Sequence, residues 1–117
     1  MYQIDVKKFM DICDQPSDQG IESEQAELYM DLITEEYLET VQAFALRDKV
    51  EVADGLADMV WVIMGMANTL NIPFEDVWNE VKASNMSKCT DGKVMKNEDG
   101  KVMKPEGYFR PDIASVL

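Results

Sequence analysis

Residues 29–65 read YMDLITEEYLETVQAFALRDKVEVADGLADMVWVIMG, and this stretch decides the fold. Steps of three and four residues trace one face of a first helix. That face runs through Tyr29, Leu32, Glu36, Glu39, Ala43 and Leu46. Arg47 and Asp48 mark its end, and a second helix follows from Lys49 to about Leu70. Because the break between them is short, we expect the two helices to pack antiparallel.

Acidic side chains on this apolar face need an explanation. A buried carboxylate is costly unless a cation pairs with it or a cleft opens onto it. The second helix has the same feature, since Glu51, Asp54 and Asp58 share one face that leads into an apolar half. Five carboxylates are expected to converge between the helices, namely Glu35, Glu36, Glu39, Asp54 and Asp58. A divalent cation would relieve their repulsion, although a solvated acidic face is the alternative.

The composition narrows the chemistry. The 117 residues include no His and two Cys, so hard oxygen ligands for Mg²⁺, Mn²⁺ or Ca²⁺ are favoured over a zinc site. The net charge is −12, with −14 in residues 1–81 and +2 in residues 82–117. An acidic body argues against nucleic-acid binding, whereas the basic tail suits a small phosphorylated ligand. We expect a cytoplasmic protein with buried or idle thiols, without a signal peptide or membrane span.

The remaining segments predict two further helices and a tail. Val6, Phe9 and Met10 have helical spacing near the N-terminus, and Pro73 suits the first turn of a fourth helix. The predicted fold is all-α, an antiparallel bundle of about four helices completed by oligomerisation. The helical domain is assigned to residues 1–88 and the tail to residues 89–117. The sequence DGKVMK occurs twice in that tail, at 91–96 and 99–104, which predicts a small hairpin or a flexible basic arm.

These motifs resemble a known family. EEYLE at 35–39, followed by ADGLADMVWVIMG at 53–65, resembles the all-α nucleoside triphosphate pyrophosphohydrolases, the MazG-like and phosphoribosyl-ATP pyrophosphohydrolase-like group. The family's mark is Glu-Glu-x-x-Glu on one helix and Glu-x-x-Asp on the next. EVKASNMSK at 80–88 and KPEGYFRPD at 104–112 also look like the C-terminal part of some members. The resemblance covers about residues 5–112.

The resemblance implies a Mg²⁺-dependent enzyme, with Mn²⁺ as a possible substitute, that hydrolyses a (deoxy)nucleoside triphosphate to the monophosphate and pyrophosphate. Glu35, Glu36 and Glu39 match the first motif. In the second, Asp58 matches the aspartate and Gly55 stands where the glutamate belongs, so Asp54 is expected to supply the missing carboxylate and Glu51 to support it.

Glu36 or Glu39 is the expected catalytic residue that orients the attacking water. Expected substrate contacts are Asn85, Lys88, Lys104 and Arg110, and a helix C-cap is an equal interpretation of Asn85. Trp61 is assigned to the core, with stacking on a base as the alternative. The expected assembly is a homo-dimer or homo-tetramer. Two other interpretations stay open: an acidic DNA mimic, and an inactive family member that acts as a scaffold.

Overall fold

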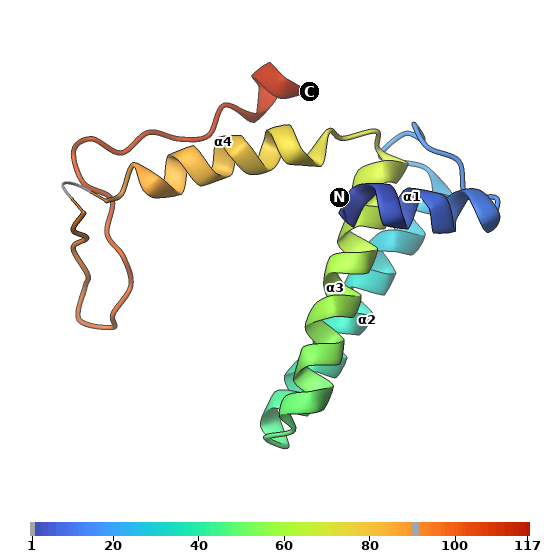
Figure 1. The fold of residues 1–117 in the computed structure, drawn as a ribbon, viewed down its shortest axis with the longest axis horizontal. Helices are drawn as coiled ribbons and strands as arrows, with labels where there is room; N and C mark the ends of the chain where they lie inside the picture. The colour runs from blue at the N-terminus through green and yellow to red at the C-terminus, as the bar shows by residue number, and fades with distance from the viewer. Residues whose placement is uncertain (1, 90–91) are drawn as a thin grey trace. The chain divides into compact units, whose positions relative to one another are not determined.

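The computed structural model describes residues 2–89 and 92–117, and these residues form four α-helices and no strand (Figure 1). The helices are α1 Tyr2–Ile12, α2 Glu24–Ala45, α3 Lys49–Thr69 and α4 Phe74–Met86, followed by a short 3₁₀ helix, η1 Ile113–Val116. The all-α prediction is confirmed. As predicted, α2 ends just before Arg47, and α3 begins at Lys49 and ends next to Leu70.

Polar side chains cap the two long helices. Ser23 precedes α2, and its hydroxyl accepts a hydrogen bond of 3.1 Å from the amide of Ala26. Asp48 precedes α3, and its carboxylate accepts one of 3.2 Å from the amide of Glu51. Arg47 joins the helices in the left-handed conformation, with φ of 57°. Such caps satisfy amides that have no partner inside the helix, so this short connection stops one helix and starts the next.

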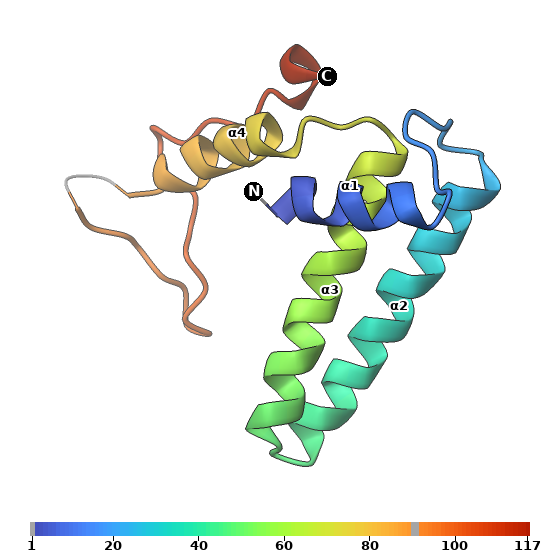
Figure 2. The ribbon, with the colours of Figure 1, turned by 45° about the vertical axis from the view of Figure 1, so that its right-hand side comes forward.

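Two close contacts fix the register of α2 against α3. A Cβ added at Gly55 would lie 2.2 Å from Oγ1 of Thr40, and one added at Gly65 would lie 2.1 Å from Cε1 of Tyr29. The higher-numbered residue of α2 therefore meets the lower-numbered residue of α3. The helices are antiparallel, as predicted, and Figure 2 shows them side by side along their length.

The first helix lies across the C-terminal half of α3 (Figure 2). Val6 and Met10 are buried in this contact, and Nδ2 of Asn68 donates a hydrogen bond of 3.1 Å to the carbonyl of Gln3. Trp61 meets the ring of Phe9 edge-on at 5.5 Å between centroids, yet its side chain is 41% exposed. Its assignment to the core was wrong because α1 covers only one edge of the indole.

The predicted inward face of α2 also needs correction at two positions. Tyr29 and Ala43 are buried as expected, but Glu39 is exposed and Leu46 is 74% exposed. Thr40 is buried in their place because it lies opposite Gly55. Over a helix of 22 residues, steps of three and four residues drift away from the line of contact with α3. The observed contact face of α2 passes through Glu36 and Thr40.

The chain divides into two compact units, with the boundary between Ile72 and Pro73, so α4 groups with the tail. The predicted boundary after residue 88 stays a prediction. Within the second unit, Lys96 pairs with Val102 in an antiparallel bridge, and the amide of Met103 donates a 2.7 Å hydrogen bond to the carbonyl of Met95. This part of the tail is a small hairpin. The first repeat begins at Asp91, which lies outside the described residues.

Two further expectations concern the thiols and the membrane. Cys13 and Cys89 are both free and exposed, so they are not core residues. Within residues 2–89 and 92–117, no helix is long and apolar enough to cross a bilayer.

Candidate functional site

The register of the α2–α3 pair determines which acidic residues meet. Glu36 lies one helical turn before Thr40, and Asp58 lies about one turn after Gly55. Thr40 and Gly55 face each other in an antiparallel pair. One helical turn back along α2 and one turn forward along α3 therefore lead in the same direction, which brings Glu36 opposite Asp58. Glu35 and Glu39 flank Glu36 on α2. These four carboxylates therefore come from two helices to one side of the pair.

Glu36 occupies the most perturbed position of this group. Burial raises the pKa of its carboxyl above the ordinary value of 4.5, and the negative charges of Glu39, Asp58 and Glu35 raise it further. Its Oε2 atom is buried without a hydrogen-bond partner among the described residues. A carboxylate oxygen in this position is destabilised as an anion, so it gains most from a cation placed beside it.

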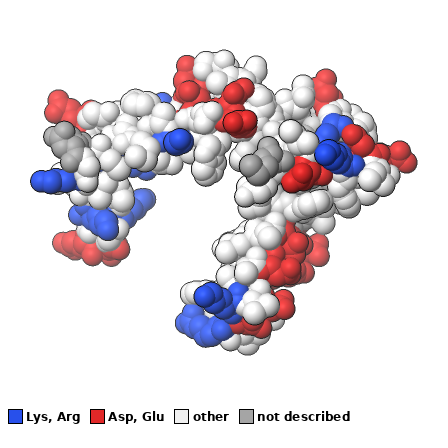
Figure 3. All heavy atoms as spheres, viewed as in Figure 1, with Lys and Arg blue, Asp and Glu red and all other residues white. Residues whose placement is uncertain are grey.

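The other predicted ligands are more open to solvent. Glu35, Glu39, Asp54 and Asp58 are exposed, as is Glu51, and Figure 3 shows acidic side chains along one edge of the α2–α3 pair. Asp54 is not among the charges that act on Glu36. In the part of the chain that the structure describes, no three acidic or thiol side chains lie close enough to form a metal site.

The residues present nevertheless fit a hard divalent cation. All the candidate donors are carboxylate oxygens, the ligand type that Mg²⁺ and Mn²⁺ prefer. The Oε2 atom of Glu36 is buried without a hydrogen-bond partner among the described residues, so a cation beside it would offset the cost of its desolvation. Glu39 and Asp58 already act on the charge of Glu36, so their carboxylates are the first candidates to share a cation with it.

Gly55 has a packing reason that the sequence did not reveal. Its position is buried, and a Cβ there would lie 2.2 Å from Oγ1 and 3.1 Å from Cβ of Thr40. The family's glutamate therefore has no room at position 55 while threonine occupies position 40. Asp54 lies beside it on the solvent side of α3, so a carboxylate remains available one residue away.

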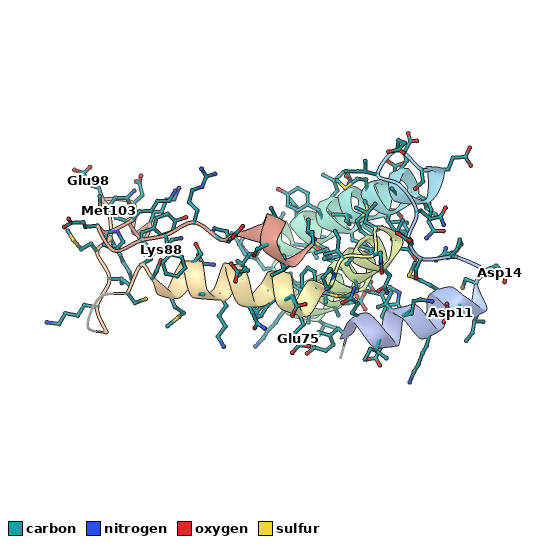
Figure 4. The ribbon with its side chains drawn as sticks, turned by 90° about the horizontal axis from the view of Figure 1, so that it is seen from above. Asp11, Asp14, Glu75, Lys88, Glu98 and Met103 are labelled. Carbon is teal, nitrogen blue, oxygen red and sulfur yellow. The ribbon has the colours of Figure 1, made fainter. Side chains whose placement is uncertain are left out.

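A second cluster lies in the unit formed by α4 and the tail. The ammonium groups of Lys88 and Lys104 lie 5.9 and 5.2 Å from the ring centre of Tyr108. The neighbouring Ser84 hydroxyl, which donates a 2.8 Å hydrogen bond to the carbonyl of Phe109, is the first cause that lowers the pKa of Tyr108. The positive charges of Lys104, Lys88 and Arg110 lower this pKa further, and burial opposes them. Figure 4 shows Lys88 at the end of α4. Three of the predicted substrate contacts thus share one aromatic neighbour.

Asn85 also belongs to this end of α4. Its Oδ1 accepts a 3.0 Å hydrogen bond from Nζ of Lys88, and the C-cap of α4 is Ser87. The C-cap interpretation of Asn85 was therefore wrong, and the side chain instead positions a lysine. The sequence by itself assigns no role to Tyr108. The segment GYFRPD could have indicated a role for Tyr108. It places this aromatic residue two positions before Arg110 in a basic tail.

Comparison with known proteins identifies the family of the chain. The family model described as phosphoribosyl-ATP pyrophosphohydrolase matches residues 6–85, which is more than half of the chain. The matched range contains every carboxylate described above, and it ends before Lys88 and the tail. Among curated proteins, no match to the chain is found. The chain belongs to the phosphoribosyl-ATP pyrophosphohydrolase family of the all-α NTP pyrophosphohydrolase superfamily, and it is a hydrolase of the class that acts on phosphoric anhydrides.

Proposed function

We propose that this protein is a Mg²⁺-dependent hydrolase that converts a (deoxy)nucleoside triphosphate into the monophosphate and pyrophosphate. The main support is the environment of Glu36, whose buried oxygen has no partner and whose pKa is raised by burial and by Glu39, Asp58 and Glu35. Glu35, Glu36, Glu39, Asp54 and Asp58 would hold the metal, with Glu51 beside them. Mn²⁺ has the same ligand preference and would substitute.

The bound metal would neutralise triphosphate charge and lower the pKa of a coordinated water. Glu36 and Glu39 are the candidates for the general base. Water adds to phosphorus and loses a proton to the carboxylate, while the α–β anhydride bond breaks and pyrophosphate leaves. One water molecule is consumed and one anhydride bond is broken, which gives the nucleoside monophosphate, pyrophosphate and one proton.

Phosphate recognition is assigned to the cluster around Tyr108. Lys88, Lys104 and Arg110 supply positive charge in a chain whose net charge is −12, and Asn85 holds Nζ of Lys88. Such a chain repels a triphosphate in general, so a local group of cations is needed to attract it. We assign these four residues to contacts with the phosphates of the substrate or of the pyrophosphate product.

A homo-dimer or homo-tetramer is proposed from an uncovered apolar face of the α2–α3 pair. Along α2, Met30, Thr34, Tyr37, Val41 and Phe44 follow one another at steps of four, three, four and three residues. The four apolar members of this set are between 46% and 61% exposed. Steps that alternate between three and four build the seam of a helix that packs lengthwise on another helix.

The third helix extends the same face. Val52, Leu56, Met59 and Ile63 repeat the steps of four, three and four, and Leu56 is 52% exposed. In an antiparallel pair, residues that lie at the same rotation from the contact line end on the same side. Helical geometry therefore puts both apolar stripes on one side and Glu36, Glu39 and Asp58 on the other. A second copy offers a matching uncharged stripe, so a four-helix core is the proposed assembly.

A cytoplasmic location is proposed from the two free, exposed cysteines, since exposed thiols persist in a reducing compartment. The competing candidates are the acidic DNA mimic and the inactive scaffold. Exposed acidic side chains along the helix pair are the observation in favour of a mimic. Both candidates predict no turnover of any nucleotide.

The experiment is a pyrophosphate-release assay with a panel of ribo- and deoxyribonucleoside triphosphates and Mg²⁺. We expect turnover by the parent protein, its loss after removal of metal with EDTA, and its loss in the Glu39→Gln variant with thermal stability equal or higher. The matched control is Glu27→Gln, because Glu27 is exposed on the same helix but on its other side. Absence of turnover on every nucleotide, or full activity of Glu39→Gln, would refute the proposal.

A further inference from the structure

A groove between α1 and α3 lies outside the acidic cluster. Its volume is about 340 Å³, and its walls are mostly apolar. Tyr2, Asp5 and Val6 of α1 face Ala57, Trp61 and Met64 of α3 across it. The volume falls within the range of small-molecule sites, which are typically apolar with a few polar groups that set orientation.

Two side chains give this groove a recognisable chemistry. Trp61 is 41% exposed, and the edge-on contact with Phe9 holds its ring while leaving part of it open. An exposed indole is a surface on which a planar heterocycle stacks. Asp5 is the carboxylate in the walls, and no hydrogen bond or ion pair joins it to another residue that the structure describes. A carboxylate only accepts hydrogen bonds when it is ionised, so it selects a donor.

The position of Trp61 on α3 connects the groove with the acidic cluster. Trp61 follows Asp58 by three residues and Asp54 by seven, so all three lie on the same side of the helix within two turns. A nucleotide whose phosphates lie near Asp54 and Asp58 would place its base about one to two turns further along α3. At that distance the neighbouring surface is Trp61 and the mouth of the groove.

We propose that this groove binds the base of the nucleotide substrate and selects bases that have an exocyclic amino group. The inference rests on the proposed function and extends it to the substrate class. Trp61 stacks on the base, and the Asp5 carboxylate accepts a hydrogen bond from the amino group. Cytosine and adenine present an amino donor where uracil and thymine present a carbonyl acceptor, so a carboxylate repels the latter pair.

The test is nucleotide binding measured by tryptophan fluorescence without metal or turnover. A Trp78→Phe background leaves Trp61 as the fluorescent tryptophan, and Trp78 is an exposed side chain of the other unit. Deoxycytidine monophosphate and deoxyuridine monophosphate are the probes, because they differ in the amino and carbonyl groups at one ring position. We expect the cytosine probe to quench Trp61 fluorescence with an affinity at least about tenfold higher than the uracil probe.

The variants separate base selection from stacking. Asp5→Asn should reduce the preference for cytosine by about tenfold, because an amide also donates to a carbonyl. Asp14→Asn is the matched control, since Asp14 is an exposed acid that follows the same helix, and it should keep the preference. In a further arm followed by heat of binding, Trp61→Phe should retain cytosine binding and Trp61→Leu should weaken it by about fivefold or more.

The outcomes also separate this inference from the proposed function. Equal affinity for the two probes, or an unchanged preference in Asp5→Asn, overturns the groove as the base site even if triphosphates are hydrolysed. A cytosine preference that depends on Asp5 supports the groove even if no nucleotide is turned over, in which case the hydrolase proposal alone fails.

Discussion

Replacing Gly55 with alanine tests the close approach of α2 and α3 that positions the acidic cluster. The added Cβ would lie 2.2 Å from Oγ1 of Thr40, 3.1 Å from its Cβ and 3.4 Å from its Cα. The hydroxyl cannot move away freely, because it donates a 2.7 Å hydrogen bond to the carbonyl of Glu36. The helices must therefore separate, or Thr40 must change rotamer and lose that bond.

The expected cost follows from two opposing effects. Overpacking a close contact costs about 1–3 kcal/mol. Alanine is a better helix former than glycine by about 1 kcal/mol, which offsets part of that cost. The two effects leave a net cost of about 0–2 kcal/mol. Because the 2.2 Å contact is far inside van der Waals distance, we expect Gly55→Ala to lower the free energy of unfolding by about 1–2 kcal/mol. Gly55→Glu, which introduces the family's residue, should lower it more. The result would show that packing and not chemistry keeps this position free of a side chain.

The assay is urea unfolding followed by far-ultraviolet circular dichroism at one fixed protein concentration, which is needed because assembly alters apparent stability. Gly107→Ala is the matched control, since nothing lies within 4 Å of its Cβ and φ is not in the left-handed range. It should change stability by less than about 0.5 kcal/mol. In a Thr40→Ala background, Gly55→Ala should cost less. Equal or higher stability of Gly55→Ala in the Thr40 protein would refute the reasoning.

Three more predictions concern charge and assembly. In metal-free protein, Glu36→Gln should raise the melting temperature at neutral pH. The pKa of Glu36 in the folded protein lies above 4.5, so its contribution to stability is full below pH 4.5 and is lost as the pH rises through the folded pKa. The difference in melting temperature between the two proteins should therefore shrink on acidification, and a pH-independent difference would contradict this. The pKa of Tyr108 should rise in Ser84→Ala, seen by absorbance titration of tyrosinate, and an unchanged titration would remove Ser84 as the first cause. Phe44, which is 61% exposed, should be required for assembly, so Phe44→Asp should lower the sedimentation coefficient; a parent protein that is monomeric at all concentrations would refute the apolar face as an interface.

Much of the candidate site is local in sequence and was therefore predictable. Glu36 and Glu39 share a helix, as do Asp54 and Asp58, so helical periodicity alone put each pair on one face. The short break at Arg47 and Asp48 also required the two helices to meet. The predicted metal set stays a prediction, because no metal cluster forms among the described residues.

The errors about burial have one physical cause, which is that burial depends on the neighbour that packs against a face. Trp61 looks like a core residue in an apolar run, but α1 reaches only one edge of its ring. Leu46 continues the pattern of α2 beyond the end of the contact and is 74% exposed. Thr40 carries no hydrophobic signal and is buried because Gly55 lets the backbones approach.

The sequence by itself determined the four helices, the antiparallel pairing of α2 with α3 and the acidic character of their shared face, because these features follow from short-range periodicity and turn chemistry. Only the tertiary structure decided that Glu36 is the carboxylate whose oxygen lacks a partner and that Lys88, Lys104 and Tyr108 gather at one place. Desolvation, and contacts between residues distant in the chain, arise from packing distances that periodicity does not encode.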